Sequence, residues 1–323
     1  MEKTILPVVA GPTASGKTAC AVALCRLIGG EVISADSMQI YSGMSILSAM
    51  PGPEETRGVP HHLMGCVDPG TKFSADAYRA AAKACIEEVR GRGHVPVLCG
   101  GTGLYIDAVT RPMSFSQQSD EALHRELIDL AAEPGGKARL HAMLDEVDPE
   151  SARRLHENDV RRVARGIEIY RLTGVTQTEH TRRDREREGD YREVLFALDW
   201  PRNTLYSRID ARVEEMVRCG LVDEVKALMA DEGSHPTAIQ AIGYKEIVEA
   251  LTGETSMERA IWRTKQATRY LAKRQLTWFR RDPRVIWLQA EGKTAEELAK
   301  QMRDLLVERF GSPFIENRSN EDM

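Results

Sequence analysis

A glycine-rich segment near the amino terminus, GPTASGKT at residues 11–18, constrains the fold more than any other part of the chain. It matches the pattern G-x-x-x-x-G-K-[ST], in which backbone N–H groups surround a phosphate and the following helix adds partial positive charge. The apolar run ILPVVA before it is typical of a strand, and TACAVALCRLI after it is typical of a helix. This order predicts a P-loop, with Lys17 reaching phosphate oxygens and the Thr18 hydroxyl binding Mg²⁺.

Strand-like and helix-like segments alternate in the first third of the chain. EVISADS (31–37) and HVPVLCGGTG (94–103) have the short apolar runs of buried strands, and the helix-like segment 73–93 lies between them. Such alternation predicts an α/β fold with a P-loop NTPase-like parallel sheet core, covered by helices.

From about residue 112 the pattern changes to helices joined by polar loops. Helices are predicted within 119–136, 137–148 and 158–174, the last with Asp159 as its cap and Gly174 as its stop. The segment TRRDREREGDYR mixes both charges and is interpreted as a solvated linker, after which REVLFALDW resumes the sheet pattern. We therefore expect a catalytic core of residues 1–111 and 191–323, interrupted by a helical insertion domain of residues 112–190.

The bulk properties favour a soluble, cytoplasmic protein, which we expect to be a monomer. No apolar run approaches the length of a membrane span, and the amino terminus does not resemble a signal peptide. None of the six cysteines forms a CxxC pair, which argues against a zinc site or a disulfide framework. The net charge of −5 does not by itself suggest nucleic acid.

The residues after the predicted strands narrow the choice of ligand. The sequence has no N-K-x-D motif of a GTPase, and the strand HVPVLCGG ends in glycines followed by Thr102 rather than in a Walker B aspartate. A carboxylate follows the other strand instead, at Asp36. Ligands of open α/β sheets bind where the strands end, so the P-loop, Asp36 and Thr102 are predicted to face one crevice. Three roles remain open for Asp36: Mg²⁺ ligand, base, or cap of the next turn.

Two segments have a concentrated positive charge. Residues 259–281 contain eight Lys or Arg and no acid, and all eight lie on one half of a helical wheel. Residues 160–170 similarly place Arg161, Arg162 and Arg165 beside an apolar stripe. Such runs are usually solvated helix faces, but those faces normally mix both signs, so we interpret these two as surfaces for a polyanion.

Aromatic side chains also occur in the first of these segments. Trp262, Trp278 and Phe279 are predicted to pack against the fold rather than to stack on bases.

Several further motifs occur in a fixed order along the chain: ISADSMQIY, GGTGLY, RIDARVEEM, AIGYKE and TRYLAKRQLTWFR. Together with GPTASGKT they make the chain resemble the bacterial tRNA dimethylallyltransferases, also called tRNA isopentenyltransferases, from about residue 5 to residue 290. The resemblance implies that the P-loop binds the diphosphate of dimethylallyl diphosphate rather than ATP. It implies that the acceptor is the exocyclic amine of the adenine just 3′ of the tRNA anticodon.

The resemblance also implies roles for particular residues. Asp36 is the expected base, and Lys17 and Arg212, the latter from the RIxxR segment, are expected to stabilise the leaving diphosphate together with Mg²⁺ on Thr18. The expected diphosphate-binding residues are Gly11, Pro12, Thr13, Ala14, Ser15, Gly16, Lys17 and Thr18. The expected tRNA-binding residues are Asp36, Ser37, Met38, Gln39, Thr102, either His124 or Arg125, Arg161, Arg162, Val163, Ala164, Arg165, Gln240, Ala241, Ile242, Gly243, Tyr244 and Lys245.

Three other functions compete with this interpretation. A nucleoside-type kinase would also use a P-loop and an aspartate after the second strand, but it would not need the basic insertion. An isopentenyltransferase acting on free adenine nucleotides would not need it either. An RNA-binding module without enzymatic activity would leave Lys17 and Thr18 unexplained.

Overall fold

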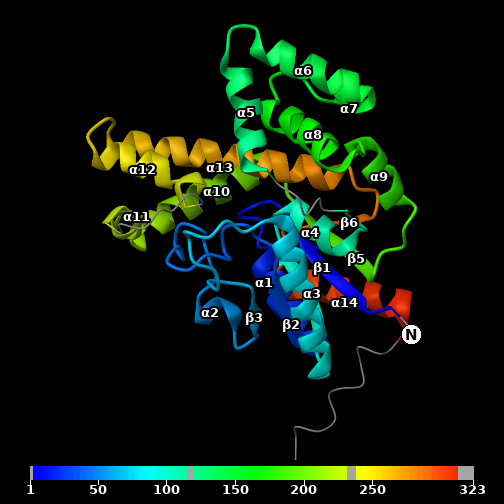
Figure 1. Ribbon diagram of the computed structural model, residues 1–323. Helices are drawn as coiled ribbons and strands as arrows, with labels where there is room; N and C mark the ends of the chain where they lie inside the picture. Colours follow the sequence, from blue (N-terminus) through cyan, green and yellow to red (C-terminus); the bar gives the residue numbers. More distant parts are fainter. Residues whose placement is uncertain (1–2, 115–119, 231–237, 312–323) are drawn as a thin grey trace, which may run out of the picture. The chain divides into compact units, whose positions relative to one another are not determined.

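The computed structural model describes residues 3–114, 120–230 and 238–311 of the chain. Its centre is a parallel six-stranded sheet in the order β3-β2-β4-β1-β5-β6 (Figure 1). The strands are β1 (Ile5–Ala10), β2 (Gly30–Ser34), β3 (His61–His62), β4 (Val95–Gly100), β5 (Arg192–Asp199) and β6 (Val285–Gln289). The predicted α/β fold with a parallel sheet is confirmed.

The strand order brings three loops together. β4 lies between β1 and β2, so the segments that follow these three strands leave the sheet side by side at its carboxyl edge. The segment after β1 is the P-loop, the one after β2 contains Asp36, and the one after β4 contains Thr102.

Helices cover both faces of the sheet, as the alternation along its central strands requires. In β1, Val8 and Ala10 belong to one buried cluster and Val9 to the other, because successive side chains of a strand point to opposite faces. The helices of this part are α1 (Lys17–Ile28), α2 (Pro53–Thr56), α3 (Ala75–Gly91), α4 (Gly103–Thr110), α10 (Arg202–Arg218), α11 (Leu221–Ala230), the short 3₁₀ helix η1 (Ala238–Gln240), α12 (Tyr244–Leu251), α13 (Met257–Arg280) and α14 (Ala295–Phe310). Over the residues that the structure describes, no helix is both long and apolar enough to cross a membrane.

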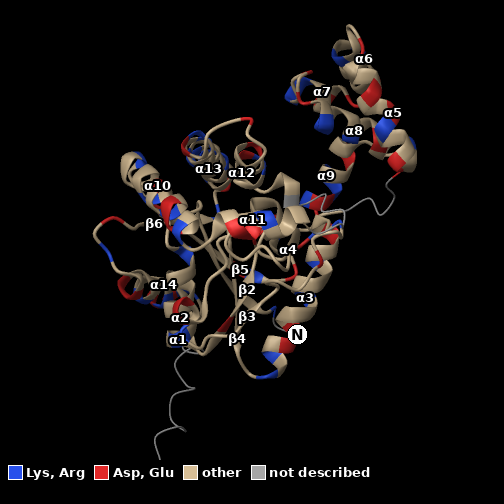
Figure 2. Cartoon of the chain, turned by 90° about the vertical axis from the view of Figure 1, so that its left-hand side faces the viewer, with Lys and Arg blue, Asp and Glu red and all other residues tan. Residues whose placement is uncertain are grey.

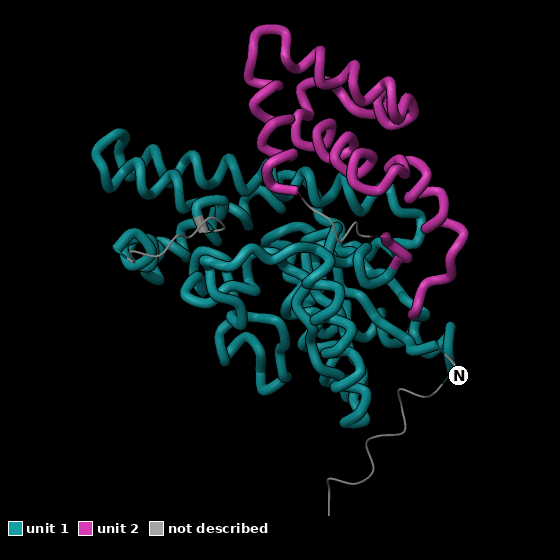
Figure 3. Tube along the Cα trace, in the orientation of Figure 1, with its two compact units in different colours: residues 1–110, 191–323 teal, residues 111–190 magenta. Residues whose placement is uncertain are grey.

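The chain divides into two compact units, residues 1–110 with 191–323 and residues 111–190, which we call the core unit and the insertion unit (Figure 3). The insertion unit contains α5 (Glu121–Ala132), α6 (Gly136–Val147), α7 (Pro149–Arg154), α8 (Val160–Thr173) and α9 (Gln177–Arg185). It has a buried cluster of its own, which includes Leu127, Leu144 and Ile167. The expected stop of α8 is confirmed, because Gly174 takes the left-handed conformation there with a φ of 69°.

The segment interpreted as a solvated linker is helical over its first residues, and that interpretation is wrong there. α9 begins after Thr176, whose side chain accepts a hydrogen bond from the N–H of Glu179. Glu179 in turn binds Arg182 and Arg183, three and four residues further along. Such spacings bring opposite charges together on one helix face, and they stabilise a helix in a sequence that has almost no apolar residues.

A buried carboxylate away from the P-loop joins β2 to β3 and to the segment between α3 and β4. Glu31 in β2 is 2% exposed and accepts hydrogen bonds from Arg92 at 3.1 and 2.6 Å. It also lies 2.5 Å from ring nitrogens of His62 and of His94. The bonds from Arg92, followed by those from the two histidines, lower the pKa of Glu31 to about 2.

We predict that Glu31→Gln lowers the free energy of unfolding by about 1–3 kcal/mol at neutral pH, because bonds to a charged acceptor are lost. Because the pKa of Glu31 is lower in the folded state than its ordinary value of 4.5, the ionised carboxylate stabilises the fold at pH values above 4.5. This stabilisation is lost as the pH falls towards 2. The difference between wild type and variant should therefore shrink between those two pH values. Urea denaturation at pH 7 and at pH 3 measures it. An equal difference at both values would contradict the prediction.

Candidate active site

The P-loop connects β1 to the first turn of α1. Gly16 occupies the position just before the helix with a φ of 88°, a conformation that glycine adopts without strain. Because α1 begins at Lys17, the first N–H groups of the helix face the loop rather than an intrahelical partner. The sequence prediction of a strand–loop–helix unit is confirmed in this region.

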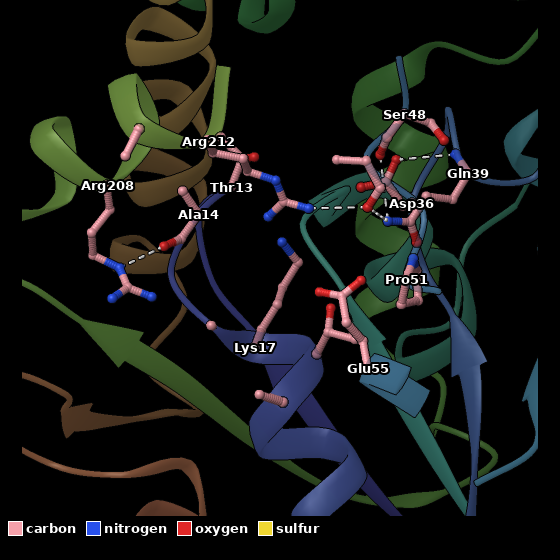
Figure 4. A pocket seen from close by; sticks show the side chains of 15 residues that line it. Thr13, Ala14, Lys17, Asp36, Gln39, Ser48, Pro51, Glu55, Arg208 and Arg212 are labelled. Carbon is pink, nitrogen blue, oxygen red and sulfur yellow. Dashed lines mark hydrogen bonds between the residues drawn. The ribbon is translucent and has the colours of Figure 1, made fainter. Parts of the chain in front are cut away.

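A cavity of about 430 Å³ opens over this loop. Three cationic side chains line it, Lys17 from α1 and Arg208 and Arg212 from α10. Two carboxylates, Asp36 and Glu55, line it as well (Figure 4). The excess of cations suits a ligand with several negative charges.

Burial makes all three of these cations costly to keep charged, including Arg208, whose pKa it lowers. It lowers the pKa of Lys17, an effect that the nearby Asp36 carboxylate opposes, and it lowers the pKa of Arg212. The Lys17 ammonium lies 3.4 Å from the carbonyl oxygen of Pro12, and Arg212 donates to the carbonyl of Ala49 at 3.0 Å. A bound anion would stabilise the charged form of both side chains.

Arg208 is a cavity residue that the sequence analysis missed. Its Nε donates to the carbonyl of Ala14 at 2.9 Å, and its guanidinium lies 4.3 Å from the centre of the Trp200 ring. The indole of Trp200 donates to the carbonyl of Ser15 at 2.9 Å. Both side chains are thus tied to the P-loop itself. The RIDAR motif could have predicted Arg208, because Arg208 and Arg212 are four residues apart and therefore share one face of α10.

Asp36 acts as a cap and also lines the cavity. Its Oδ1 accepts a hydrogen bond from the N–H of Met38 at 2.9 Å and a longer one of 3.5 Å from Gln39. The capping role is therefore present, and the carboxylate still faces the P-loop cavity. One role does not exclude the other, because a carboxylate can accept several hydrogen bonds.

A second cavity of about 230 Å³ adjoins the first. Both cavities are lined by Asp36 and Arg212, and by Thr13, Ser48 and Ala49. The second alone is lined by Ser37, Met38, Leu47, Thr102, Ile209, Val213, Met216, Gln240, Ala241, Ile242, Thr264, Thr268, Leu271, Arg274 and Gln275. This wall combines apolar side chains with a few hydrogen-bonding groups, as is usual for a site that binds an organic group.

The loops behind the shared wall hold one another in place. The N–H of Ser37 donates to Thr102 Oγ1 at 3.0 Å, which links the ends of β2 and β4. Gln39 donates to the carbonyl of Ala49 at 3.2 Å, so its side chain supports the loop that lines both cavities. Glu224 fixes the same loop from α11, accepting from the N–H of Leu47 at 2.6 Å.

Gln275 of α13 connects the P-loop to the end of β4. Its side-chain oxygen accepts from the N–H of Thr13 at 2.8 Å, and its side-chain nitrogen donates to the carbonyl of Gly101 at 3.0 Å. A Cβ on residue 101 would lie 2.3 Å from that nitrogen, so only glycine permits this approach. Sequence reasoning missed Gln275, because its partners lie far away in the chain.

Of the predicted residues from Gln240 to Lys245, the first three lie at the second cavity. Gln240, Ala241 and Ile242 line it, and Gly243 precedes α12 with a φ of 101°. Lys245 is exposed and lies 3.8 Å from the carboxylate of Glu249.

The structure separates the predicted residues of the insertion unit into exposed and buried ones. The side chains of Val163 and Ala164 are fully buried in α8, so the expectation that they contact a ligand is wrong for their side chains. Arg161 is exposed. The neighbouring Arg162 binds Asp159 of the same unit at 3.1 Å.

Glu168, which is 2% exposed, links two further candidates of this unit. It accepts a hydrogen bond from Arg165 at 2.7 Å and lies 3.4 Å from His124 Nδ1. His124 therefore lies beside a predicted contact residue, whereas Arg125 is an exposed residue of the same helix, α5.

Ion pairs within the fold already neutralise half of the basic face of α13. Its cations Arg263, Lys265, Arg269 and Arg280 form ion pairs with Glu249, Glu214, Asp210 and Asp199 of neighbouring elements. A helical wheel shows only one helix, so it cannot reveal carboxylates that other helices supply. Figure 2 shows basic and acidic positions intermixed over the helices.

The aromatic residues of α13 differ in burial. Phe279 packs in the core as predicted, and Trp278 donates to Asp107 at 3.0 Å. Trp262 is 48% exposed with the Arg259 guanidinium 4.4 Å from its ring centre, so the prediction that it packs is wrong.

The donor groups of the first cavity fit Mg²⁺. No cluster of three or more histidine, cysteine or acidic side chains able to hold a metal occurs within residues 3–114, 120–230 and 238–311. Mg²⁺ commonly binds through one or two protein oxygens together with phosphates of a substrate. The P-loop Thr18 and the carboxylates of Asp36 and Glu55 all line the cavity and could supply such oxygens.

The chain is similar over most of its length to a known family and to individual proteins. A family model described as IPP transferase matches residues 39–282. A tRNA dimethylallyltransferase of Carboxydothermus hydrogenoformans is 41% identical over 301 residues, 93% of this chain and 96% of that protein. One of Geobacillus thermodenitrificans is 47% identical over 282 residues, 87% of this chain and 89% of that protein.

Two solved structures are similar over most of the chain. The crystal structure of a tRNA isopentenylpyrophosphate transferase from Staphylococcus epidermidis has a TM-score of 0.71 and 36% identity, covering 95% of this chain and 100% of that one. A eukaryotic dimethylallyltransferase acting on tRNA has a TM-score of 0.80 and 28% identity, covering 95% of this chain and 79% of that one.

We predict that two substitutions of Gln275 weaken the binding of inorganic diphosphate by different amounts. Gln275→Met removes both hydrogen bonds and should lower stability by about 1–3 kcal/mol, because Thr13 N–H and Gly101 C=O lose their partner. Gln275→Glu keeps an acceptor for Thr13 but adds a negative charge beside the P-loop, so it should weaken binding more than Gln275→Met does. Calorimetric titration with diphosphate and Mg²⁺ measures the diphosphate affinity of both variants, and urea denaturation measures the loss of stability.

The control is Gln301→Glu, which adds the same charge to α14, a helix that lines neither cavity. Wild-type diphosphate affinity in Gln275→Glu would mean that Gln275 does not position the P-loop.

Proposed function

The chain belongs to the IPP transferase family, and we propose that it is a tRNA dimethylallyltransferase. In the proposed reaction the dimethylallyl group of dimethylallyl diphosphate moves to the exocyclic N6 amine of the adenine just 3′ of the anticodon, and diphosphate leaves. The observation that carries the proposal is the pair of adjoining cavities, one cationic and one largely apolar, which share Asp36 and Arg212.

The first cavity is proposed to bind the diphosphate of the donor. The P-loop N–H groups, Lys17, Arg208 and Arg212 surround the space where its negative charge would grow as the C1–O bond breaks. Fixed charges of this kind lower the barrier because they need no reorganisation during the reaction. Expelling an allylic diphosphate requires this stabilisation, because the electron pair of the C1–O bond leaves with the diphosphate while the allylic group becomes a cation.

Thr18, with Asp36 and Glu55 nearby, is proposed to hold Mg²⁺ together with the donor. The bound ion would neutralise charge on the leaving diphosphate.

The second cavity is proposed to receive the adenine and the dimethylallyl group. An adenine stacked within the anticodon loop cannot reach a recessed site, so it must first be extruded. Asp36 lies at the wall between the cavities, where the N6–C1 bond would form. The amine nitrogen is weakly nucleophilic because its lone pair is delocalised into the ring. Asp36 is proposed to accept the N6 proton as the bond forms.

The insertion unit is proposed to hold the anticodon stem-loop. Its exposed cations Arg161, Arg162 and Arg125 suit contacts with phosphates, and His124 lies beside Arg165 at Glu168. We propose that the protein works as a monomer in the cytoplasm, with Ser37, Thr102 and the residues from Gln240 to Lys245 around the extruded adenine.

The competing functions fit the second cavity less well. A kinase would need a site for a nucleoside hydroxyl group beside the γ-phosphate, whereas much of this wall is apolar. A transferase acting on free adenine nucleotides leaves the insertion unit unexplained. Incubation with labelled dimethylallyl diphosphate or ATP, and with tRNA or AMP as acceptor, separates these activities. Our proposal expects label only in the pair of dimethylallyl diphosphate and tRNA.

We predict that Asp36→Asn slows transfer by about 10²–10⁴-fold, because an amide does not accept the amine proton. The amide oxygen can still accept from Met38 N–H, so the turn should persist and tRNA binding should change little. Single-turnover rates at saturating donor and tRNA measure the chemical step. Near-normal turnover in this variant would refute the assignment of the base.

We predict that the double variant Arg161→Ala, Arg162→Ala makes tRNA affinity less dependent on salt. Each phosphate contact contributes about −0.9 to the slope of log K against log salt in a duplex, so the slope should flatten by up to about 1–2 units. Arg165 is left unchanged because its loss would leave the buried Glu168 without that partner.

Lys137→Ala, in α6 of the same unit, is the control, since Lys137 binds Asn158 rather than a predicted ligand. If the plots of log K against log salt had the same slope for wild type and the double variant, these arginines would be solvated surface residues that do not contact tRNA.

A further inference from the structure

The cations of α13 differ in whether other parts of the protein already neutralise them. Four of the eight form ion pairs with carboxylates of α12, α10 and β5, and Arg259 stacks on Trp262. The others are Lys273, Arg274 and Arg281. Within the part of the chain that the structure describes, no carboxylate pairs with Arg274.

Arg274 also differs from Lys273, Arg281 and Arg259 in its position. It lines the second cavity, whereas Lys273, Arg281 and Arg259 are not among the lining residues. On α13, Thr264, Thr268, Leu271 and Gln275 follow the spacing of one helix face, and all four line this cavity. Arg274 flanks that stripe and is exposed, so it lies where the cavity meets solvent.

An extruded nucleotide needs a cation at the rim of the cavity that receives its base. The base can enter a largely apolar cavity, but its phosphates cannot leave water without a compensating charge. They must therefore remain at the rim while the base is inside. A guanidinium binds a phosphate through two parallel hydrogen bonds, which fixes orientation as well as supplying attraction.

We propose that Arg274 binds a backbone phosphate next to the extruded adenine and so holds the base in the second cavity. This inference rests on the proposed function, because it takes tRNA as the acceptor. It assigns to one residue of α13 a role that its paired neighbours do not share. Arg263, Lys265 and Arg269 instead hold α12 and α10 against α13.

The test compares Arg274→Ala with Lys273→Ala, which removes an adjacent exposed cation that does not line the cavity. For Arg274→Ala we expect KM for tRNA to rise roughly tenfold, as loss of a charged hydrogen bond implies. The salt slope of tRNA binding should fall by about 0.7, the contribution of one contact in a single strand. KM for dimethylallyl diphosphate should stay at its wild-type value, and Lys273→Ala should change every parameter by roughly twofold or less.

A conservative variant separates bidentate binding from simple attraction. Arg274→Lys should restore the salt slope but only part of the affinity, because an ammonium does not form the paired bonds. Equal effects of Arg274→Ala and Lys273→Ala would overturn the proposal in favour of general attraction by the helix. A rise in KM for the donor alone would overturn it by placing Arg274 at the diphosphate.

The binding measurements need no donor, so they test Arg274 separately from the proposed function. If the wild-type protein transferred no label to tRNA, the proposed function would fail. The salt slopes of the two variants would still show whether Arg274 contacts the RNA backbone.

Discussion

The site depends on one side-chain amide that bonds to two loops at once. Gln275 accepts from Thr13 in the P-loop and donates to Gly101 after β4, which sets the spacing between the loops that line the two cavities. The sheet brings these loops close, since β4 lies between β1 and β2, but strand order alone does not fix distances to a few tenths of an ångström. A third element, α13, supplies that precision and also lines the cavity next to its bridging residue.

The local parts of the fold could be predicted from the sequence because their causes are local. The P-loop, the strand ends that place Asp36 and Thr102, and the helices α5, α6 and α8 of the insertion unit each follow from runs of neighbouring residues, whereas the short α7 was not predicted. The segment around α9 was misinterpreted, because its mixed charges stabilise a helix through pairs such as Glu179 with Arg183 rather than through an apolar face. Val163 and Ala164 were assigned by motif position, which does not distinguish a buried side chain from an exposed one.

What could not be predicted depends on partners that are distant in sequence. The charge run of α13 suggested an open cationic surface, but carboxylates from α10, α12 and β5 neutralise half of it. Arg208 likewise reaches the P-loop through its contacts with Ala14 and Trp200, which lie on separate segments. The net charge of a helix therefore indicates its capacity to bind a polyanion only when the cations already paired within the fold are left out of the count.

The insertion unit enters the chain between α4 and β5, and its described residues contribute no strand to the sheet. All described residues that line the two cavities belong to the core unit. The sheet's hydrogen-bond ladder thus passes directly from β1 to β5, whatever is inserted between residues 110 and 191. Helices can be lengthened, exchanged or recharged in that interval without altering a strand register or the wall between the cavities. Under the proposed function, in which the insertion unit holds the tRNA, such an arrangement would allow the choice of acceptor to diverge while the machinery that breaks and forms bonds stays the same.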